Sequence, residues 1–357
     1  HPFGHACLWQ RWPSSSPSQS RPEVWIRILE LHARLSMAVK HVNKKLMRRD
    51  RVTQELNLLQ RLQHPHIVSL IDTYETPASY ALVMEMADQG RLLDYIVSWG
   101  NLTEEKVACY LRDILEALHY LHNSRIVHLD VKVSSSPLML FLLLSLIPTV
   151  KLTDFGDAVQ LNSAHYVHPL LGSPEFASPE LVLGEPVSLN SDMWSLGVVT
   201  YVLLSGASPF LDESAEETCL NICQLDFSFP RDYFQGVSQA ARDFICLLLR
   251  TDPGRRPPAG LCLQEPWLQV GTAEGRARAE GCLDTSRLIS FIDRRKHQTD
   301  ARAMGGVRSF IQIFFYTLSD PHPSDYFILL YAVQKQQQNA VNAKKNNNVP
   351  VTDSDFL

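Results

Sequence analysis

Apolar residues recur with two different periods along this chain. The run "SMAVKHV" (36–42) is typical of a short β-strand, and the segment 48–65 carries apolar residues at helical spacing until Pro65 stops the pattern. Two further runs, 66–76 and 79–87, predict strands that are separated by a turn. The first part of the chain is therefore predicted to be rich in strands, with one helix.

Beyond these strands the pattern is mainly helical. Gly90 and Gly100 bracket a short predicted helix. The segment 103–124 opens with Thr103 as an N-cap and continues as a long amphipathic helix, and the segment 191–206 is apolar nearly all round, as expected of a buried helix. Strands followed by helices predict an α+β fold, in which a small β-rich lobe precedes a larger helical lobe.

Two terminal stretches lack any such period. Residues 1–22 are rich in Pro and Ser, and the chain beyond residue 311 ends in a Gln/Asn/Lys tract, so we expect both to be disordered. The most apolar runs, 138–147 and 326–333, are shorter than the roughly 20 residues that a bilayer crossing needs. We therefore expect no membrane span.

Composition places the chain among globular proteins. Of its 357 residues 45% are hydrophobic and 20% are charged, which is enough to bury a sizeable core. The 38 acidic and 33 basic residues give a formal net charge of −5, so there is no global basic field to attract nucleic acid. The seven cysteines lack zinc-site spacing, and we expect reduced thiols in a cytoplasmic protein.

Four side chains are candidates for the charges that phosphoryl transfer requires. This reaction needs positive charge at the phosphates, a carboxylate for the metal ion and a carboxylate that orients the attacking hydroxyl. Lys40 lies on the first predicted strand, and Glu55 lies beside the apolar stripe of the next helix, where an ion pair with Lys40 is suggested. Asp130 is the candidate base and Asp154 the candidate magnesium ligand.

This ordered set carries a family resemblance. The motifs are "AVK" (38–40), "LVMEMA" (82–87), "HLDVK" (128–132), "DFG" (154–156), "GSPEFASPE" (172–180), "SDMWSLGV" (191–198) and "DPGRRP" (252–257). With them the chain resembles the eukaryotic protein kinases of the serine/threonine branch. The resemblance covers residues 36–270 and implies a two-lobed kinase fold, with the N-lobe at 36–87 and the C-lobe at 88–270.

The resemblance also implies cofactors and roles. ATP and Mg²⁺ are the expected cofactors, and a protein with Ser or Thr hydroxyls is the expected substrate. Met84 is expected behind the adenine pocket, where backbone groups of Glu85 and Ala87 bind the adenine. Lys132 is expected at the γ-phosphate, and Lys40 at the α- and β-phosphates.

Other residues match structural positions of the family. Ser173 stands where the serine/threonine branch carries a hydroxyl that contacts the catalytic aspartate and lysine. Glu180 is expected to pair with Arg256, and Asp192 to tie the catalytic loop to the buried helix. Leu129 stands where many kinases have arginine, so no adjacent cation is present to receive an activation-segment phosphate.

A closer resemblance is to the kinase domains at the C-terminal end of the Trio/kalirin Rho guanine-nucleotide-exchange proteins, nearer Trio. It rests on "VNKKLMRRD", "EMADQGRLLD", "DFGDAVQLN" and "SPFLDESAEETCLNIC", and on "LDTSRLISFIDRRKHQTD" in the basic tail 271–311. It implies that the chain is one part of a larger multidomain signalling protein. Residues 1–35 and 312–357 carry no family character and are expected to be atypical segments.

The chain departs from the family pattern before Lys40. No glycine-rich stretch precedes Lys40, where the family folds a hairpin over the ATP phosphates. Backbone amides approach phosphates closely through glycines or a helix start, so nucleotide affinity should fall. The small lobe is also expected to lack its first two strands, which would expose a sheet edge.

A second departure follows the catalytic motif. Ser135 occupies the place of the family's asparagine, a ligand of the second magnesium ion, and a hydroxyl is a poorer ligand than an amide oxygen. The apolar segment 133–147 has two interpretations: a buried strand pair or helix, or foreign sequence such as a translated intron. The chain is therefore either a serine/threonine kinase, impaired or not, or a catalytically inactive pseudokinase-like interaction module.

Overall fold

The computed structural model describes residues 7–10, 23–30, 35–44, 49–77, 79–85, 92, 96–97, 100, 102–132, 149–161, 174–269 and 281–301. The chain divides into two compact units. The first comprises residues 1–48, 70–85 and 303–357, and the second comprises residues 49–69 and 86–302.

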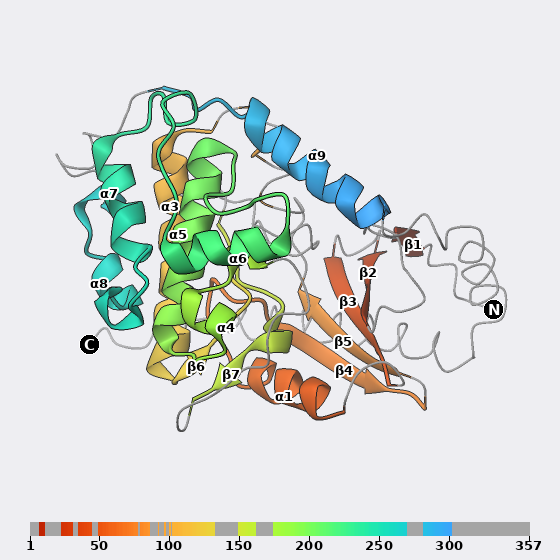
Figure 1. The fold of residues 1–357 in the computed structure, drawn as a ribbon. Coiled ribbons are helices and arrows are strands. Elements are labelled where there is room, and N and C mark those ends of the chain that lie inside the picture. Colours follow the sequence, from red (N-terminus) through yellow and green to blue (C-terminus); the bar gives the residue numbers. More distant parts are fainter. Residues whose placement is uncertain are drawn as a thin grey trace, which may run out of the picture. The chain divides into compact units, whose positions relative to one another are not determined.

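The first unit contains a five-stranded antiparallel sheet. Its strands are β1 (Cys7–Gln10), β2 (Glu23–Glu30), β3 (Leu35–Asn43), β4 (Leu70–Glu75) and β5 (Ser79–Glu85). They pair in the order β1-β2-β3-β5-β4 (Figure 1). The strands predicted at 36–42, 66–76 and 79–87 are confirmed as β3, β4 and β5.

The expectation that the small lobe lacks its first two strands is wrong. β2 pairs with β3 over its whole length, and β1 pairs with β2. The expectation rested on the absence of glycine between Gly4 and Gly90. Glycine decides how closely a loop approaches a ligand, whereas an antiparallel ladder needs only paired backbone N–H and C=O groups. The segment 1–35 therefore contributes two strands to the sheet, although its loop has no glycine.

The two faces of β3 and β5 differ in what they carry. One face holds a small core cluster made of Met37, Val39, Ala81 and Val83. Because side chains alternate along a strand, Lys40 lies on the opposite face. Lys40 is the cross-strand partner of Leu82, and Ala38 is the partner of Met84, so these four buried side chains share one face. Lys40 and Met84 are thereby brought to the same side of the sheet.

The second unit contains the helices (Figure 1). They are α1 (Arg49–Leu59), α3 (Glu104–Asn123), α4 (Pro179–Leu183), α5 (Leu189–Ser205), α6 (Ala215–Gln224), α7 (Gln239–Leu248), α8 (Ala259–Cys262) and α9 (Ser286–Ala301), with 3-10 turns η1 (Phe155–Asp157), η2 (Pro174–Phe176), η3 (Pro253–Arg255) and η4 (Pro266–Leu268). The two-residue strands β6 (Ile126–Val127) and β7 (Val159–Gln160) pair with each other.

α3 and α5 lie side by side, α7 packs on α5, and α8 packs on α3 (Figure 1). Thr103 caps α3 as predicted, since its side chain accepts the N–H of Lys106. All residues of α5 from Ser191 to Ser205 are buried, which confirms the predicted lobe-centre helix. A helix surrounded by protein in this way is a rigid support for the loops that contact its N-terminal end.

The helix predicted within 48–65 is confirmed as α1, which lies in the second compact unit. Its side chains explain this. Arg51 forms an ion pair with Asp157 at 2.7 Å, and the Gln54 side-chain amide donates to the Ala158 carbonyl at 2.7 Å. The contacts of α1 therefore run to the segment around η1, which lies about 100 residues further along the chain.

Several predicted segments are described only in part or not at all. In the short helix predicted between Gly90 and Gly100, the described residues Leu92, Ile96 and Val97 are helical. The segment 133–147 and the tail 312–357 lie outside the described residues, so both interpretations of 133–147 stand. Among the helices that the structure describes, none has the length and apolar character needed to cross a membrane.

The predicted basic tail 271–311 contains α9, which packs on α5. Leu288 and Phe291 of α9 are buried. Gly206, the C-cap of α5, has φ +71°, and a Cβ added there would lie 2.5 Å from the Leu288 nitrogen and 2.8 Å from the Arg287 carbonyl carbon. The backbone of α9 therefore passes position 206 too closely for any side chain.

We predict that Gly206→Ala lowers the free energy of unfolding by at least about 2 kcal/mol, because it combines the cost of a left-handed alanine with a backbone clash. Gly184→Ala is the matched control, since Gly184 also has φ +71° but nothing lies within 4 Å of its added Cβ. The control should cost about 1 kcal/mol. Urea denaturation of both variants measures the difference, and equal costs would contradict the close approach of α9.

Candidate active site

Asp192 anchors the loop that carries the candidate base. Asp192 lies in the first turn of α5, where a negative charge is favoured by the helix dipole, and it is completely buried. Its Oδ2 accepts the backbone N–H of His128 at 2.9 Å, and its Oδ1 accepts the N–H of Leu129 at 2.8 Å. The predicted tie between the catalytic loop and the buried helix is present. His122 Nε2 also lies 2.9 Å from Asp192 Oδ2.

His128 links this loop to the segment that carries Asp154. Its Nδ1 accepts the backbone N–H of Asp130 at 3.3 Å, so Nε2 carries the proton and donates to the Thr153 carbonyl at 3.2 Å. The His128 ring also meets the buried Phe155 ring edge-on, with centroids 4.8 Å apart. One imidazole thereby connects the two halves of the site, "HLD" and "DFG".

Asp130 and Lys132 form a short-range ion pair. Lys132 Nζ donates to both carboxylate oxygens of Asp130, at 2.6 and 2.7 Å. Burial raises the pKa of Asp130, the Lys132 ammonium opposes this rise, and the negative charge of Asp154 adds to it. The Asp154 carboxylate is therefore near enough to Asp130 for the two charges to interact, within one compact unit.

Asp154 stands at a backbone turn. It has φ 64° and ψ 74°, a left-handed conformation that aspartate tolerates better than most residues, and it precedes η1. The following residues are held by α1 through Asp157 and Ala158, as described above. Strand pairing of Ile67 with Leu152 fixes the chain just before Asp154. The candidate metal ligand is thus positioned from both sides.

The candidate nucleotide residues lie partly in the first unit. Lys40 and Met84 are buried on one face of the sheet, and Glu85 is half-buried at the end of β5. Glu55 is buried on α1, which belongs to the second unit, so the predicted Lys40–Glu55 ion pair stays a prediction. Two other predicted site residues, Ala87 and Ser173, lie outside the described residues.

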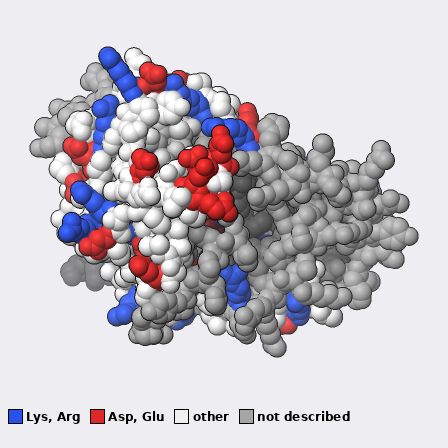
Figure 2. All heavy atoms as spheres, viewed as in Figure 1, with Lys and Arg blue, Asp and Glu red and all other residues white. Residues whose placement is uncertain are grey.

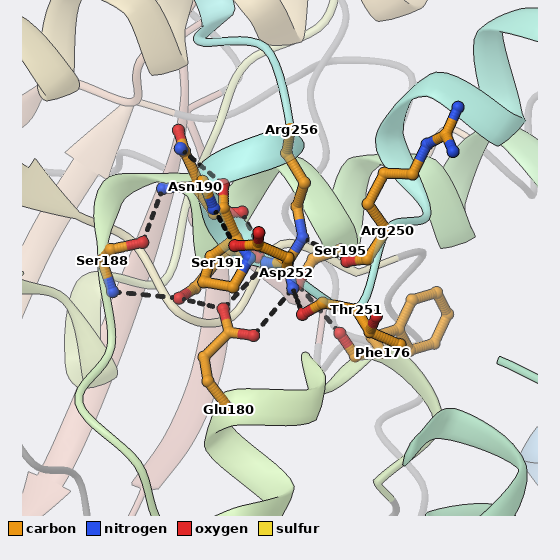
Figure 3. A network of polar contacts seen from close by, with 12 residues as sticks. Phe176, Glu180, Ser188, Asn190, Ser191, Ser195, Arg250, Thr251, Asp252 and Arg256 are labelled. Atoms are coloured by element: carbon orange, nitrogen blue, oxygen red, sulfur yellow. Dashed lines mark hydrogen bonds and ion pairs between the residues drawn. The ribbon is translucent and has the colours of Figure 1, made fainter. Parts of the chain in front are cut away.

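Glu180 and Arg256 form the predicted ion pair, and it is buried and bidentate (Figure 3). Both guanidinium NH₂ groups donate to Glu180 at 2.8 Å. The remaining donors go to three backbone carbonyls, those of Arg250, Asn190 and Thr251, so all five N–H groups of Arg256 have acceptors. Such complete satisfaction is what makes a buried ion pair tolerable.

The same network explains the pKa of Glu180. Burial alone would raise it, but the Arg256 hydrogen bonds and charge, with a hydrogen bond from Ser191, hold it below its ordinary value of 4.5. Because the folded-state pKa is lowered, this group contributes stability that is present above pH 4.5 and lost as pH falls through the folded-state pKa.

Leu129 has a structural role that sequence reasoning missed. It has φ 62°, which is strained for a leucine, and its N–H bond to Asp192 holds it there. Its side chain packs against a cluster formed by Val127, Leu161, Ala177, Leu181 and Val187. Leu161 and Ala177 lie on either side of residues 162–173 in the sequence, so an apolar contact joins both flanks of the activation segment to the catalytic loop. His122, the third partner of Asp192, was missed as well. A single histidine in an amphipathic helix has no sequence pattern that marks it as the partner of a distant carboxylate.

The surface near α6 is acidic. Asp212, Glu213, Glu216 and Glu217 are exposed. Figure 2 shows a group of acidic side chains on the face that it draws. Two of them serve the local fold, since Glu217 completes a capping box with Ser214 and Asp212 accepts a hydrogen bond from Asn221. The acidic group is thus explained in part by the start of α6.

We predict that Arg256→Lys lowers the free energy of unfolding by about 3 kcal/mol, because a lysine cannot reproduce the bidentate fork and leaves buried acceptors unpaired. Arg255→Lys is the matched control, since the Arg255 side chain is 79% exposed and its nearest carboxylate is 3.5 Å away. The control should change stability by less than about 0.5 kcal/mol. Chemical denaturation at neutral pH compares the two, and an equally mild Arg256→Lys variant would refute the role of the fork.

Comparison with known proteins agrees with this geometry. Residues 24–268 match the family model described as the protein kinase domain. Death-associated protein kinase 2 of Mus musculus is 34% identical over 270 residues, covering 73% of this chain and 72% of that protein. Smooth muscle myosin light chain kinase of Gallus gallus is 35% identical over 269 residues, covering 74% of this chain but 14% of that protein.

A solved structure shows the same fold. The twitchin kinase region from C. elegans aligns with a TM-score of 0.68 and 31% sequence identity, covering 78% of this chain and 48% of that one. The family match starts at residue 24, within β2. The chain belongs to the protein kinase family, and its relatives place it among kinases of the serine/threonine type.

Proposed function

We propose that this chain transfers the γ-phosphoryl group of ATP to a Ser or Thr hydroxyl of a protein substrate. The observation that carries the proposal is the Asp130–Lys132 pair, which is held on a loop that Asp192 anchors to the buried helix α5. A carboxylate and a cation held side by side are what the transfer needs, because one orients the hydroxyl while the other lies by the phosphate.

Asp130 acts as the base in this proposal. Its carboxylate accepts a hydrogen bond from the substrate hydroxyl, orients that oxygen, and takes the proton as the oxygen bonds to the γ-phosphorus, while the bond from that phosphorus to the bridging oxygen breaks and ADP leaves. Lys132 compensates the charge of Asp130 and offers its ammonium protons to the transferred group. The αL backbone of Leu129 and its bond to Asp192 keep Asp130 in one orientation, so little reorganisation accompanies the reaction.

The residues present fit one magnesium ion and a nucleotide. No group of three His, Cys, Asp or Glu able to hold a metal was found among the described residues, and Mg²⁺ commonly binds through one or two carboxylates together with substrate phosphates. Asp154 would supply that carboxylate, and Lys40 a buried positive charge for the phosphates. When bound, the metal ion neutralises charge on the phosphates. Met84 and the backbone of Glu85 would border the adenine.

A second candidate function is that of a catalytically inactive, pseudokinase-like interaction module. Two sequence observations favour it. The loop between β1 and β2 has no glycine, and Ser135 replaces the family's asparagine, so both a phosphate cradle and a second metal ligand are weakened. The anchored catalytic loop and the Glu180–Arg256 network would persist in such a module, because they depend on neither nucleotide nor metal.

We predict that saturating Mg²⁺-ATP raises the melting temperature of the purified chain, since a ligand stabilises the state that it binds. Asp130→Asn should keep that shift but lower phosphate incorporation into a mixture of Ser/Thr peptides by about 100-fold or more. Asp232→Asn, a change of the same chemistry at an exposed site, is the control. A shift without incorporation, or no shift at all, would favour the inactive module.

We also infer that this kinase domain is part of a larger cytoplasmic Rho guanine-nucleotide-exchange protein. The Trio/kalirin resemblance supports this, and the smooth muscle myosin light chain kinase, of which the aligned part covers 14%, is a relative with a much longer chain. An antibody against residues 286–301 should detect a band several times larger than 40.4 kDa, and its immunoprecipitate should release nucleotide from Rho GTPases. A single band near 40.4 kDa without exchange activity would count against it.

A further inference from the structure

A cluster of titratable side chains lies away from the Asp130–Lys132 pair, within the helical unit. It consists of His66, in the connection between α1 and β4, and of Asp113 and Glu116, on α3. His66 Nε2 lies 3.6 Å from Asp113 Oδ1 and 3.5 Å from Glu116 Oε2. We refer to these three residues as the His66 cluster.

The His66 cluster holds both polar backbone groups of Val150. The Val150 N–H donates to Asp113 Oδ2 at 2.7 Å, and the Val150 carbonyl lies 2.9 Å from His66 Nδ1. The backbone of His66 adds a third contact, because its carbonyl accepts the N–H of Leu152 at 2.8 Å. Val150 is fully buried, so its N–H and C=O depend on these partners rather than on water.

This arrangement requires a proton between His66 and Asp113. A carbonyl oxygen only accepts, so His66 Nδ1 carries a hydrogen and donates it to Val150. In the neutral ring Nε2 then has a lone pair, and that lone pair faces two carboxylate oxygens. The lone pair and the negatively charged oxygens repel each other. A proton on Nε2 or on Asp113 replaces that repulsion with an attractive contact between His66 and Asp113.

The neighbouring charges do not remove this requirement. Glu116 is only partly compensated, since Arg112 Nε lies 3.4 Å from its Oε1. Lys151 is buried nearby and acts on His64, whose pKa is lowered by burial and then by His66. His64 Nδ1 accepts the His66 N–H at 3.1 Å, so this nitrogen holds no proton to share.

We propose that His66 and Asp113 are positioning residues that clamp residues 150–152 through a shared proton, and thereby place Asp154 two residues further on. The clamped segment continues into Thr153, whose carbonyl accepts from His128 of the catalytic loop. The consequence for Asp154 as a metal ligand rests on the proposed function. The clamp itself does not, because it consists only of contacts within this fold.

The direction of the pH dependence follows from Asp113. Burial raises its pKa to about 6, and Glu116 adds to this, against the opposing effects of the Val150 N–H and His66. Because the pKa of the closed state is raised, the stabilisation is fully present below the ordinary value of 3.8 and is lost as pH rises through about 6. The clamp should therefore be tighter at pH 5 than at pH 7.

Amide hydrogen exchange of peptides that cover residues 149–153 tests the clamp without any need for turnover. Protection factors, corrected for intrinsic exchange, should fall about tenfold between pH 5 and pH 7 in the wild-type chain. Asp113→Asn should make protection independent of pH over this range, because the amide oxygen still accepts from Val150 while the NH₂ group donates permanently to His66 Nε2.

Asp243→Asn, the same change at an exposed aspartate on α7, should behave like the wild type. If Asp113→Asn does not fold, Asp113→Ser serves instead and should also abolish the pH dependence, because a hydroxyl does not titrate in this range. A flat wild-type profile, or a tenfold fall that survives in both cluster variants, would overturn the proposal. Since exchange is read without ATP, an inactive kinase with a pH-dependent clamp would refute the proposed function and leave the clamp standing.

Discussion

The buried carboxylate of Asp192 is the interaction on which the candidate site depends. It is fully enclosed at the start of α5, and an isolated charge there would be very costly. Backbone N–H groups of His128 and Leu129 solvate it, with His122 as a third partner. The free-energy cost of burying the charge is offset only while these groups all contact the carboxylate. The carboxylate therefore holds the catalytic loop in one conformation. Leu129 is held in a strained left-handed geometry as a result, and Asp130 is aimed by it.

A second buried carboxylate extends the same principle. Glu180 accepts hydrogen bonds from both NH₂ groups of Arg256. Arg256 also donates to the backbone carbonyls of Asn190 and Arg250. The Arg256 guanidinium also lies over the Trp194 ring, 5.2 Å from its centroid. Two charged residues thus join α4, α5 and the turn at η3 into one rigid body. This rigidity exists without nucleotide, which is why the helical unit is a sound support for either function that we considered.

Histidines connect these rigid parts to the chain segment that carries Asp154. His128 bonds Thr153 on one side, and His66 bonds Val150 on the other. Each imidazole uses its two nitrogens for two different partners, so its tautomer and its orientation are set together. The segment 149–156 is short of regular secondary structure of its own, and side chains from α3 and from two loops take the place of a continuous ladder.

Much of the helical unit was predictable, because α3 and α5 have long, strongly periodic or uniformly apolar sequences and Thr103 marks a start. Six site residues were predictable only as members of an ordered family set, since single carboxylates and cations have no distinctive local pattern. They are Asp130, Lys132, Asp154, Glu180, Asp192 and Arg256. β1 and β2 were missed because the sequence before Lys40 has no glycine-rich stretch, whereas backbone pairing in an antiparallel ladder does not depend on glycine.

The sequence by itself determined the fold class, the family and the identity of the chemistry-bearing side chains, because periodicity and motif order are properties of the chain. Only the tertiary structure decided that α1 belongs with the helical unit, that Leu129 packs into an apolar cluster and that His66 faces Asp113. These facts depend on which distant backbone and side-chain groups must satisfy one another once water is excluded, and that requirement has no signature in local sequence.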